Sequence, residues 1–423
     1  MTEAVVICEK PSDSFRLLHT ADWHLGKLLN EQSRDEEHAR FLVWLLKVVK
    51  EHRIDAIILA GDVFDTASPP QSALGRYFDF VSGLFRQDDC ALVVIAGNHD
   101  SAAQLEAPKK VLQALNTHVV GFLADKPEAR ILRLPDEKNP KVEIAMMPFL
   151  RDRDIRIGKP GESADDIRAQ VVAGIRQRYA EAAAAITGAT CPAIATGHLT
   201  VLGAKTSDSE RDIHIGGLGA VTSDTFPTTF AYVALGHLHR PQTTDAGGRV
   251  RYAGSPIALS FSEAEDVKEV RILEVTAAGI TQHGLAIPVF RRLVQVRTTN
   301  AGLEAALEKL ETSPGELRTW VEVVVEDATL EDDLNERVRK LAAGRGVEVL
   351  KVLRGNSATI TGPGIDGRTD DEAIETLLDQ PAHVFDHLLS QHAGLEEKEI
   401  AKLKAAFAVL VDLDAQPEPV QIS

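Results

Sequence analysis

The feature that most constrains this 423-residue chain is a repeated event at the ends of its short apolar runs. Five such runs stop at an alanine or glycine that is followed by aspartate, asparagine or histidine. In the clearest case, residues 91–95 lead into Gly97-Asn98-His99-Asp100. Short apolar runs bounded by turn residues are typical of buried strands, where a polar side chain costs desolvation free energy unless a partner satisfies it. One such turn would be interpreted as a helix cap, but the repetition predicts a shared site.

The apolar runs alternate with segments of helical spacing. We predict strands over residues 15–20, 56–60, 91–95, 118–120, 142–147, 192–196 and 231–235. We predict helices over residues 34–52, 71–86, 105–115 and 165–186. This alternation indicates an α/β fold with α+β elements, in which a largely parallel sheet carries helices on its faces. Such sheets bind ligands at the carboxyl ends of their strands, so the polar turns are expected to meet in one cleft.

The residue types in these turns allow only narrow chemistry. Imidazole, carboxylate and amide groups without a thiolate form a mixed nitrogen and oxygen site for divalent metals such as Mn, Fe or Zn. A single ion with all of these ligands would have no open position for substrate. Two ions about 3.5–4 Å apart, bridged by one carboxylate, would use every ligand and stabilise an in-line displacement at phosphorus. The candidate ligands are Asp22, His24, Asp62, Asn98, His198, His237 and His239.

The ordered set of motifs resembles the signature of the calcineurin-like metallophosphoesterases. Its parts here are Asp22-x-His24, Gly61-Asp62-x-x-Asp65, Gly97-Asn98-His99-Asp100, Gly197-His198 and Gly236-His237-x-His239. The phrases at residues 18–26, 232–239 and 254–261 further resemble the SbcD family, the nuclease subunits of bacterial SbcCD complexes. This resemblance is dense over residues 15–263 and continues more loosely to residue 413.

The resemblance implies a role for each site residue. One metal would be held by Asp22, His24, Asp62 and His239, and the other by Asp62, Asn98, His198 and His237. The expected ions are Mn(II), with Mg(II) as the alternative. His99 would face the phosphate and protonate the leaving oxygen or stabilise charge in the transition state. We further expect the Asp65 carboxylate to orient His99 and raise its pKa.

The implied activity is ATP-dependent exonuclease action on duplex DNA ends and endonuclease action on single strands and hairpins. These reactions belong to DNA repair, recombination and replication. The ATP would be used by an SbcC-like ATPase with a coiled coil, because this chain has no Walker-type phosphate-binding loop. Two rival interpretations remain open: a phosphoesterase for a small phosphodiester or phosphomonoester, and a scaffold that keeps the fold without catalysis.

Changes in composition divide the chain into segments, and the resemblance implies the role of each segment. We predict an N-terminal extension (1–14), a nuclease domain (15–287), a capping domain (288–354), a linker (355–368), a helical segment that binds the ATPase (369–413) and a tail (414–423). A strand pair over 268–274 and 279–286 would complete the nuclease sheet. The capping domain would contain strands over 291–297, 317–325 and 347–353, and helices over 301–310 and 330–343.

The helix predicted over residues 71–86 is unusually apolar and aromatic for an element that faces solvent. We interpret it as a self-paired interface, so that the chain is a homodimer within a heterotetramer. The last predicted helix also carries an apolar stripe that needs a partner. The alternative is that this stripe folds back onto its own domain. Its residues are Ile400, Leu403, Phe407, Leu410 and Val411.

The formal net charge of −17 argues against a nucleic-acid partner, but its distribution weakens that argument. Residues 369–423 hold 12 acidic and 3 basic side chains, whereas residues 101–160 hold 11 basic and 8 acidic ones. Global charge therefore does not decide the partner. Candidates for gripping the DNA backbone are Lys109, Lys110, Arg130, Arg151 and Arg153.

Targeting signals are not evident in this sequence. Residues 1–14 lack the pattern of a signal peptide, and no apolar stretch approaches the roughly 20 residues of a membrane helix. The 3 cysteines form no CxxC pair, which suits a reducing compartment. We therefore expect a cytoplasmic location and no membrane partner.

Several residues near the motifs have a structural interpretation. We expect His19 to be structural, Asp100 to cap the next helix and Trp23 to pack against the sheet. Seven other histidines are expected at the surface or in solvated loops. They are His38, His52, His118, His214, His383, His387 and His392.

Overall fold

The computed structural model describes residues 10–87, 90–157, 162–186, 191–207, 209–210, 220–310, 317–328 and 333–355. The chain divides into two units, Met1–Leu353 and Arg354–Ser423. The predicted linker from residue 356 onward, the helical segment and the tail lie outside the described residues, as do His214, His383, His387 and His392. Within the described residues, no helix is both long and apolar enough to cross a bilayer.

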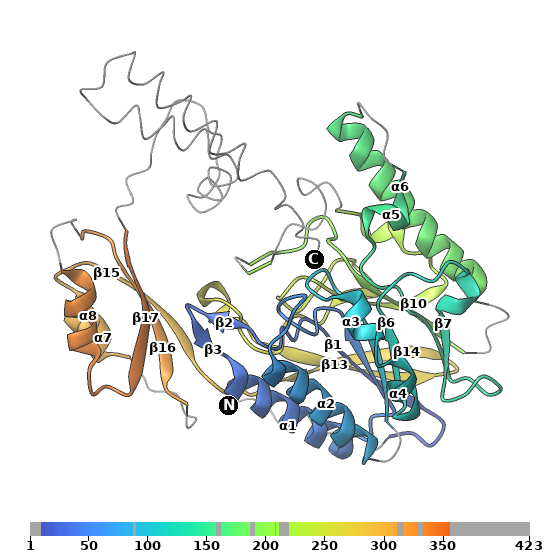
Figure 1. Ribbon diagram of the computed structural model, residues 1–423, viewed down its shortest axis with the longest axis horizontal. Helices are drawn as coiled ribbons and strands as arrows, with labels where there is room; N and C mark the ends of the chain where they lie inside the picture. Colours follow the sequence, from blue (N-terminus) through green and yellow to red (C-terminus); the bar gives the residue numbers. More distant parts are fainter. Residues whose placement is uncertain are drawn as a thin grey trace, which may run out of the picture. The chain divides into compact units, whose positions relative to one another are not determined.

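Two six-stranded sheets form the centre of the first unit (Figure 1). The first sheet has the order β14-β13-β1-β4-β5-β6. Its parallel strands are β1 (Phe15–Thr20), β4 (Ala56–Ala60), β5 (Ala91–Ile95) and β6 (Thr117–Val120). The antiparallel pair β13 (Glu269–Thr276) and β14 (Gly279–Ala286) extends it beside β1, as predicted.

The second sheet has the order β11-β12-β10-β9-β8-β7. Its parallel strands are β8 (Val142–Ala145), β9 (Ala193–His198), β10 (Phe230–Gly236) and β12 (Val250–Tyr252). Its antiparallel edges are β7 (Ile131–Leu134) and β11 (Gln242–Thr243). The mainly parallel pairing was predicted, but the division of the strands between two sheets was not.

The two sheets share one apolar core. Inner side chains such as Leu17, Ile58 and Val93 of the first sheet pack in one cluster with Ile194 and Tyr232 of the second. Because both faces of each sheet are covered, the strands are continuous apolar runs rather than alternating ones.

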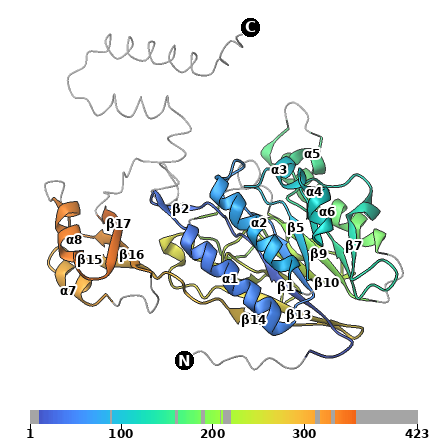
Figure 2. The same ribbon diagram turned by 60° about the horizontal axis from the view of Figure 1, so that its bottom comes forward.

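Helices cover the two outer faces (Figures 1 and 2). Helices α1 (Asp35–His52) and α2 (Gln71–Phe85) lie side by side and pack on the outer side chains of the first sheet. Helices α5 (Asp152–Ile155) and α6 (Ala164–Ala185) pack on the second sheet. Both predicted long helices on the first sheet, and α6, are confirmed.

The helix predicted over residues 105–115 is instead two short helices, α3 (Ala102–Glu106) and α4 (Lys109–Ala114). Pro108 stands between them, and a proline lacks the N–H that a continuous helix requires. The remaining short elements are β2 (Leu28–Leu29), β3 (Gln32–Ser33), η1 (Pro127–Arg130), η3 (Ser223–Thr225) and η4 (Phe261–Glu263).

The segment after residue 288 forms a small three-stranded sheet with two helices, as predicted. The elements are β15 (Leu293–Thr298), α7 (Leu303–Glu308), β16 (Thr319–Val325), α8 (Leu334–Ala342) and β17 (Val347–Arg354). Its own apolar core includes Leu303, Val321 and Val338. Trp320 contacts the guanidinium groups of Arg34 and Arg291, at 5.5 and 4.1 Å from the ring centre.

Several buried polar residues test the structural predictions. His19 is buried, with Nδ1 2.9 Å from the Tyr232 hydroxyl and Nε2 3.2 Å from the Leu235 carbonyl oxygen, so its structural role is confirmed. Trp23 is also buried, between the rings of Phe41 and Phe80. The surface prediction is wrong for two histidines, since His38 and His52 are buried as well.

Candidate metal centre

The candidate ligands follow strands of both sheets. Asp22 and His24 follow β1, Asp62 follows β4, and Asn98 and His99 follow β5. The second sheet contributes three imidazoles, from His198 at the end of β9 and from His237 and His239 after β10. The predicted site residues therefore come from the carboxyl ends of strands, as the turn motifs indicated.

The local backbone at these strand ends is strained. Asp22, His24, Asp62 and His237 have φ angles of 52°, 45°, 49° and 101°, a region that side chains with a Cβ rarely adopt. Each such residue costs on the order of 1–3 kcal/mol and persists only where its surroundings hold it. The neighbouring turns also approach closely, because a Cβ at Gly97 would overlap the Asp62 carboxylate. This explains why a glycine stands beside the polar residues.

The Asp62 carboxylate lies at the middle of the group. Its Oδ2 is 3.5 Å from His24 Nε2 and 3.3 Å from His198 Nε2, while its Oδ1 accepts from the His99 N–H at 2.9 Å. Asn98 Oδ1 is 2.9 Å from His198 Nε2. This geometry supports the role of Asp62 as the shared carboxylate.

The other ligands surround this carboxylate. Donor atoms of Asp22, His24 and His239 lie within 4.8 Å of one another, and so do those of Asp22, Asp62 and His198. The ring of His237 is 5.4 Å from that of His198, and the backbone N–H of His237 donates to Asp22 Oδ1 at 2.8 Å. The structure thus brings all the predicted ligands into one contiguous, largely buried group.

Oxygen atoms behind three of the imidazoles determine which ring nitrogen faces the carboxylates. Nδ1 lies 3.2 Å from Asp65 Oδ1 in His24, 3.0 Å from the Ala60 carbonyl in His198, and 2.6 Å from Ser209 Oγ in His239. When each Nδ1–H donates to its oxygen, Nε2 keeps the lone pair that a metal requires. The three rings are therefore oriented as metal ligands are.

The electrostatics of the group also fit a divalent cation. Asp22 Oδ2 and His24 Nε2 are buried and have no hydrogen-bond partner among the described residues. Burial and the nearby Asp62 charge raise the pKa of Asp22 to about 7. Burial alone would lower the pKa of His198, but the Asp62 carboxylate raises it to about 9. A divalent cation between these groups would neutralise the buried carboxylates. It would also bind the lone pairs of the two atoms that have no hydrogen bond.

Asp100 does not cap the next helix, contrary to the prediction. Its carboxylate accepts from the backbone N–H groups of Val63, Phe64 and Gly97 at 3.1, 3.0 and 2.9 Å. The side chain of Ser101 caps α3 instead. Asp100 therefore joins the turn that carries Asp62 to the turn that carries Asn98 and His99.

The contacts of Asp65 also differ from the prediction. His99 Nδ1 donates to the main-chain oxygen of Asp65 at 2.7 Å. The Asp65 carboxylate contacts His24 Nδ1 and, at 3.1 Å, Lys27 Nζ. The side chain of Asp65 therefore supports a candidate metal ligand, and its backbone supports His99.

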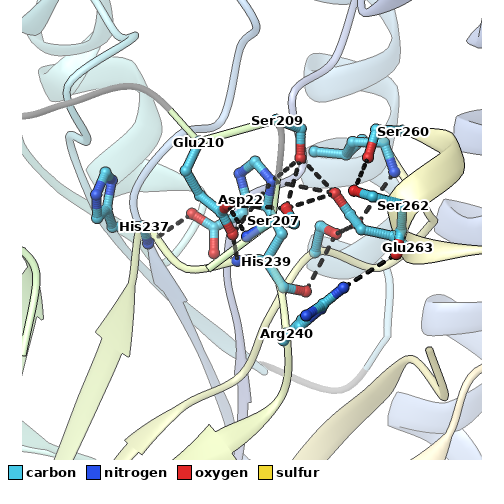
Figure 3. Close-up of polar contacts among 12 residues, drawn as sticks. Asp22, Ser207, Ser209, Glu210, His237, His239, Arg240, Ser260, Ser262 and Glu263 are labelled. Atoms are coloured by element: carbon cyan, nitrogen blue, oxygen red, sulfur yellow. Dashed lines mark hydrogen bonds and ion pairs between the residues drawn. The ribbon is translucent and has the colours of Figure 1, made fainter. Parts of the chain in front are cut away.

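A polar cluster behind His239 was not predicted (Figure 3). It contains Ser207, Ser209, Glu210, Glu263 and Lys268. These residues lie on segments distant from the histidine in sequence, so no motif spacing indicates their contact. The phrase over residues 254–261, which stops just before Glu263, was the only sequence signal near them.

Three of the candidate DNA-gripping residues differ in whether their charge is already paired within the chain. Arg130 is buried and pairs with Glu181 at 3.0 Å, so it does not offer its charge to a ligand. Arg151 and Arg153 instead lie 5.0 and 5.6 Å from the ring of Phe122, which is 38% exposed.

Comparisons with known proteins identify the family of this chain. Residues 15–157 match the calcineurin-like phosphoesterase family, and residues 289–393 match the type 5 capsule protein repressor C-terminal domain. The chain is 38% identical to the SbcD component of the nuclease SbcCD from Escherichia coli strain K12 over 344 residues, which cover 80% of this chain and 85% of that protein. Identity to the corresponding protein of Rhodobacter capsulatus is 39% over 315 residues, covering 70% and 76% of the two chains. For Bacillus subtilis the identity is 37% over 263 residues, covering 61% and 66%.

The fold, the donor set and the first family match define a metal-dependent phosphoesterase. The relatives of this chain narrow the class to one family. The chain belongs to the SbcD family, whose members are components of the nuclease SbcCD.

Proposed function

We propose that this chain is the DNA-hydrolysing subunit of an SbcCD-type nuclease and cleaves phosphodiester bonds with two divalent ions. The observation that carries the proposal is the single buried group of carboxylate, amide and imidazole donors around Asp62. The names of the relatives supply the substrate class, since they are nucleases.

In this proposal one ion is held by Asp22, His24, Asp62 and His239. The other is held by Asp62, Asn98, His198 and His237. The mixed nitrogen and oxygen donor set favours Mn(II) over Mg(II), because Mg(II) prefers oxygen ligands alone. The bound ions supply Lewis acidity that stabilises the attacking and leaving oxygens of the displacement.

His99 supplies the proton for the leaving group. Its Nδ1–H donates to the Asp65 main-chain oxygen, which fixes the ring and makes Nε2 the atom that donates to the leaving oxygen. The ring stands 4.7 Å from that of His24, beside the ligands but not replacing one of them. Asp100 and Asp62 hold the same turn through its backbone, so His99 keeps its place relative to the ligands.

The central experiment is a nuclease assay on purified chain with Mn(II) or Mg(II), using wild type and His99→Ala. We expect activity on DNA with Mn(II), and a loss of roughly 10²–10⁴-fold in the variant without loss of bound metal. Turnover of bis(p-nitrophenyl) phosphate is measured in parallel. Efficient cleavage of this small diester with no cleavage of DNA would instead support the rival small-substrate phosphoesterase.

The proposed partner is an SbcC-like ATPase that binds residues 369–413. The names of the relatives support the complex, and the apolar stripe on residues 400–411 supports the location. Deleting all residues after Arg368 is expected to abolish co-purification with the ATPase but to retain metal-dependent nuclease activity. A truncated chain that still co-purifies would exclude this segment as the binding site.

The proposed homodimer interface is on α2. Five of its residues, Ala73, Tyr77, Phe80, Val81 and Leu84, pack into the chain's own core. Phe78 and Phe85 remain 41% and 43% exposed, and their spacing places them on one face of the helix. We expect Phe78→Asp to convert a dimer into a monomer in sedimentation at micromolar concentration. A wild-type monomer in the same experiment would exclude the interface.

A further inference from the structure

The polar cluster behind His239 is built around a buried ion pair (Figure 3). Glu263 Oε2 lies 2.6 Å from Lys268 Nζ, and their side chains are 0% and 7% exposed. A buried ion pair adds little stability by itself, because desolvation of both charges offsets their attraction. Its position directly behind a candidate metal ligand therefore needs another explanation.

The hydrogen bonds run from the histidine to the carboxylate in a determined direction. Ser209 Oγ contacts both His239 Nδ1, at 2.6 Å, and Glu263 Oε1, whereas the direct separation between His239 Nδ1 and Glu263 Oε1 is longer, at 3.5 Å. A carboxylate can only accept, so the Ser209 hydroxyl must donate its hydrogen to Glu263. Its oxygen then accepts the Nδ1–H of His239. This leaves the lone pair on Nε2, the atom available for a metal together with Asp22 and His24.

Lys268 keeps the carboxylate charged and in one orientation. Its ammonium group donates to Glu263, to Ser255 Oγ at 3.0 Å and to the main-chain oxygen of His239 at 2.9 Å, which uses all three of its hydrogens. Glu263 Oε2 also accepts from the Leu259 N–H at 3.2 Å. Burial by itself raises the pKa of a carboxyl, but the contacts with His239 and Lys268 hold the pKa of Glu263 well below its usual range.

A second pair on the same segment provides a comparison. Arg240 Nε and Asp266 Oδ2 are 2.9 Å apart, and their side chains are 29% and 24% exposed. Arg240 also donates to the Ser262 carbonyl oxygen at 3.0 Å. Through these contacts Arg240 is held to the same loop as Glu263.

We propose that Glu263, acting through the hydroxyl of Ser209, is a positioning residue that sets the tautomer and orientation of His239 and so determines the metal affinity of the site formed with Asp22 and His24. The inference rests on the proposed function to the extent that His239 is a metal ligand. Neither Glu263 nor Ser209 touches substrate or the reacting atoms. Hydrogen-bond partners behind a ligating histidine typically change metal affinity about 10–100-fold.

The test measures Mn(II) binding to the full chain by electron paramagnetic resonance, for wild type, Glu263→Gln, Ser209→Ala and Asp266→Asn. We expect Glu263→Gln and Ser209→Ala to weaken one of two Mn(II) sites about 10–100-fold and to leave the other unchanged. Ser209→Thr keeps the hydroxyl and is expected to restore wild-type affinity. Asp266→Asn, the matched control, is expected to bind Mn(II) like wild type.

Two results would overturn the proposal. One is unchanged Mn(II) affinity in both variants that break the chain of hydrogen bonds. The other is an equal loss at both sites together with a lower melting temperature, which a merely structural role would produce. If Glu263→Gln does not fold, the Mn(II) affinity of Ser209→Ala alone tests the proposal, because this variant keeps the buried pair of Glu263 and Lys268. A wild-type chain that binds two Mn(II) ions but cleaves no DNA would contradict the proposed function and leave this inference intact.

Discussion

The two sheets contribute different chemistry to the candidate centre. The edge of the first sheet provides both carboxylates and the amide, on turns where Asp22 and Asp62 have left-handed backbones. The second sheet provides imidazoles, and one of them, His198, still lies within strand β9. Both carboxylates therefore come from the first sheet, which also provides His24, and the other three imidazole ligands come from the second, so the centre exists only while the two sheets pack together.

The two histidines proposed to hold the first ion, His24 and His239, differ in the residues that orient their rings. His24 contacts the Asp65 carboxylate directly, and that side chain is 16% exposed beside Lys27. His239 contacts Ser209, which donates to Glu263, and the Glu263 and Lys268 side chains behind them are 0% and 7% exposed. Both contacts are partly buried, but the contact of His239 is backed by a buried ion pair and several hydrogen bonds, whereas the contact of His24 is backed by Lys27.

The largest effect is expected from the first sheet, at the carboxylate that both ions share. Asp62→Asn should reduce DNA cleavage by about a thousandfold or more, because the several kilocalories per mole that metal ions supply correspond to that factor. It should also remove both Mn(II) ions, which paramagnetic resonance would detect. Retention of one tightly bound ion would show that Asp62 does not bridge the two positions.

A smaller effect is expected at Asp65. Because its carboxylate contacts His24, Asp65→Asn should weaken Mn(II) binding by about 10–100-fold as well as lower turnover. The interpretation from sequence, in which this side chain orients His99, instead predicts lower turnover with intact metal binding. Isothermal titration with Mn(II) distinguishes the two, and wild-type affinity in the variant would favour the interpretation from sequence.

Removing a hydrogen bond between the two sheets tests whether their packing can be weakened without changing the candidate metal centre. The Tyr232 hydroxyl on β10 is 2.9 Å from His19 Nδ1 on β1, in the core that both sheets share. Tyr232→Phe leaves that buried nitrogen unsatisfied and should lower the free energy of unfolding by about 1–3 kcal/mol. Chemical denaturation measures this loss. We expect Mn(II) affinity below the unfolding transition to be unchanged, and a large drop in affinity would mean that the link also shapes the site.

The smallest effect concerns a histidine outside the centre. Burial, with a further contribution from the charge of Arg34, lowers the pKa of His38 from 6.5 to about 3. The unfolded chain therefore binds a proton that the folded chain does not, and stability falls as the pH decreases below about 6.5. His38→Leu should remove about 1.4 kcal/mol of the stability loss between pH 7.5 and 5.5. Identical pH dependence in variant and wild type would mean that His38 is protonated in the fold.

The sequence predicted the parts of this protein that are encoded locally. Each candidate ligand lies at or just after the end of a short apolar run, so the turn motifs alone identified Asp22, Asp62 and His198 as members of the group. The burial of His38 was also predictable, because it lies three and four residues before Phe41 and Leu42 on the apolar face of α1. The split of helix 105–115 could have been predicted from Pro108.

Other features depend on contacts that no local pattern contains. The runs at residues 91–95 and 231–235 have the same apolar character, so nothing in them assigns one strand to each sheet. Asp65 and Asp100 lie in the expected turns, but the contacts of their carboxylates with His24 and with backbone N–H groups were not predicted, because either carboxylate could reach several donors. The Glu263 contact with Ser209 joins residues 54 positions apart and requires the fold to be known.

The most direct test of a shared two-metal centre is a crystal of the chain soaked in Mn(II), with anomalous diffraction locating the ions. We predict two anomalous peaks about 3.5–4 Å apart, with Asp62 between them. Asp22, His24 and His239 should surround one peak, and Asn98, His198 and His237 the other. A single peak, or ions bound away from the junction of the two sheets, would contradict this centre.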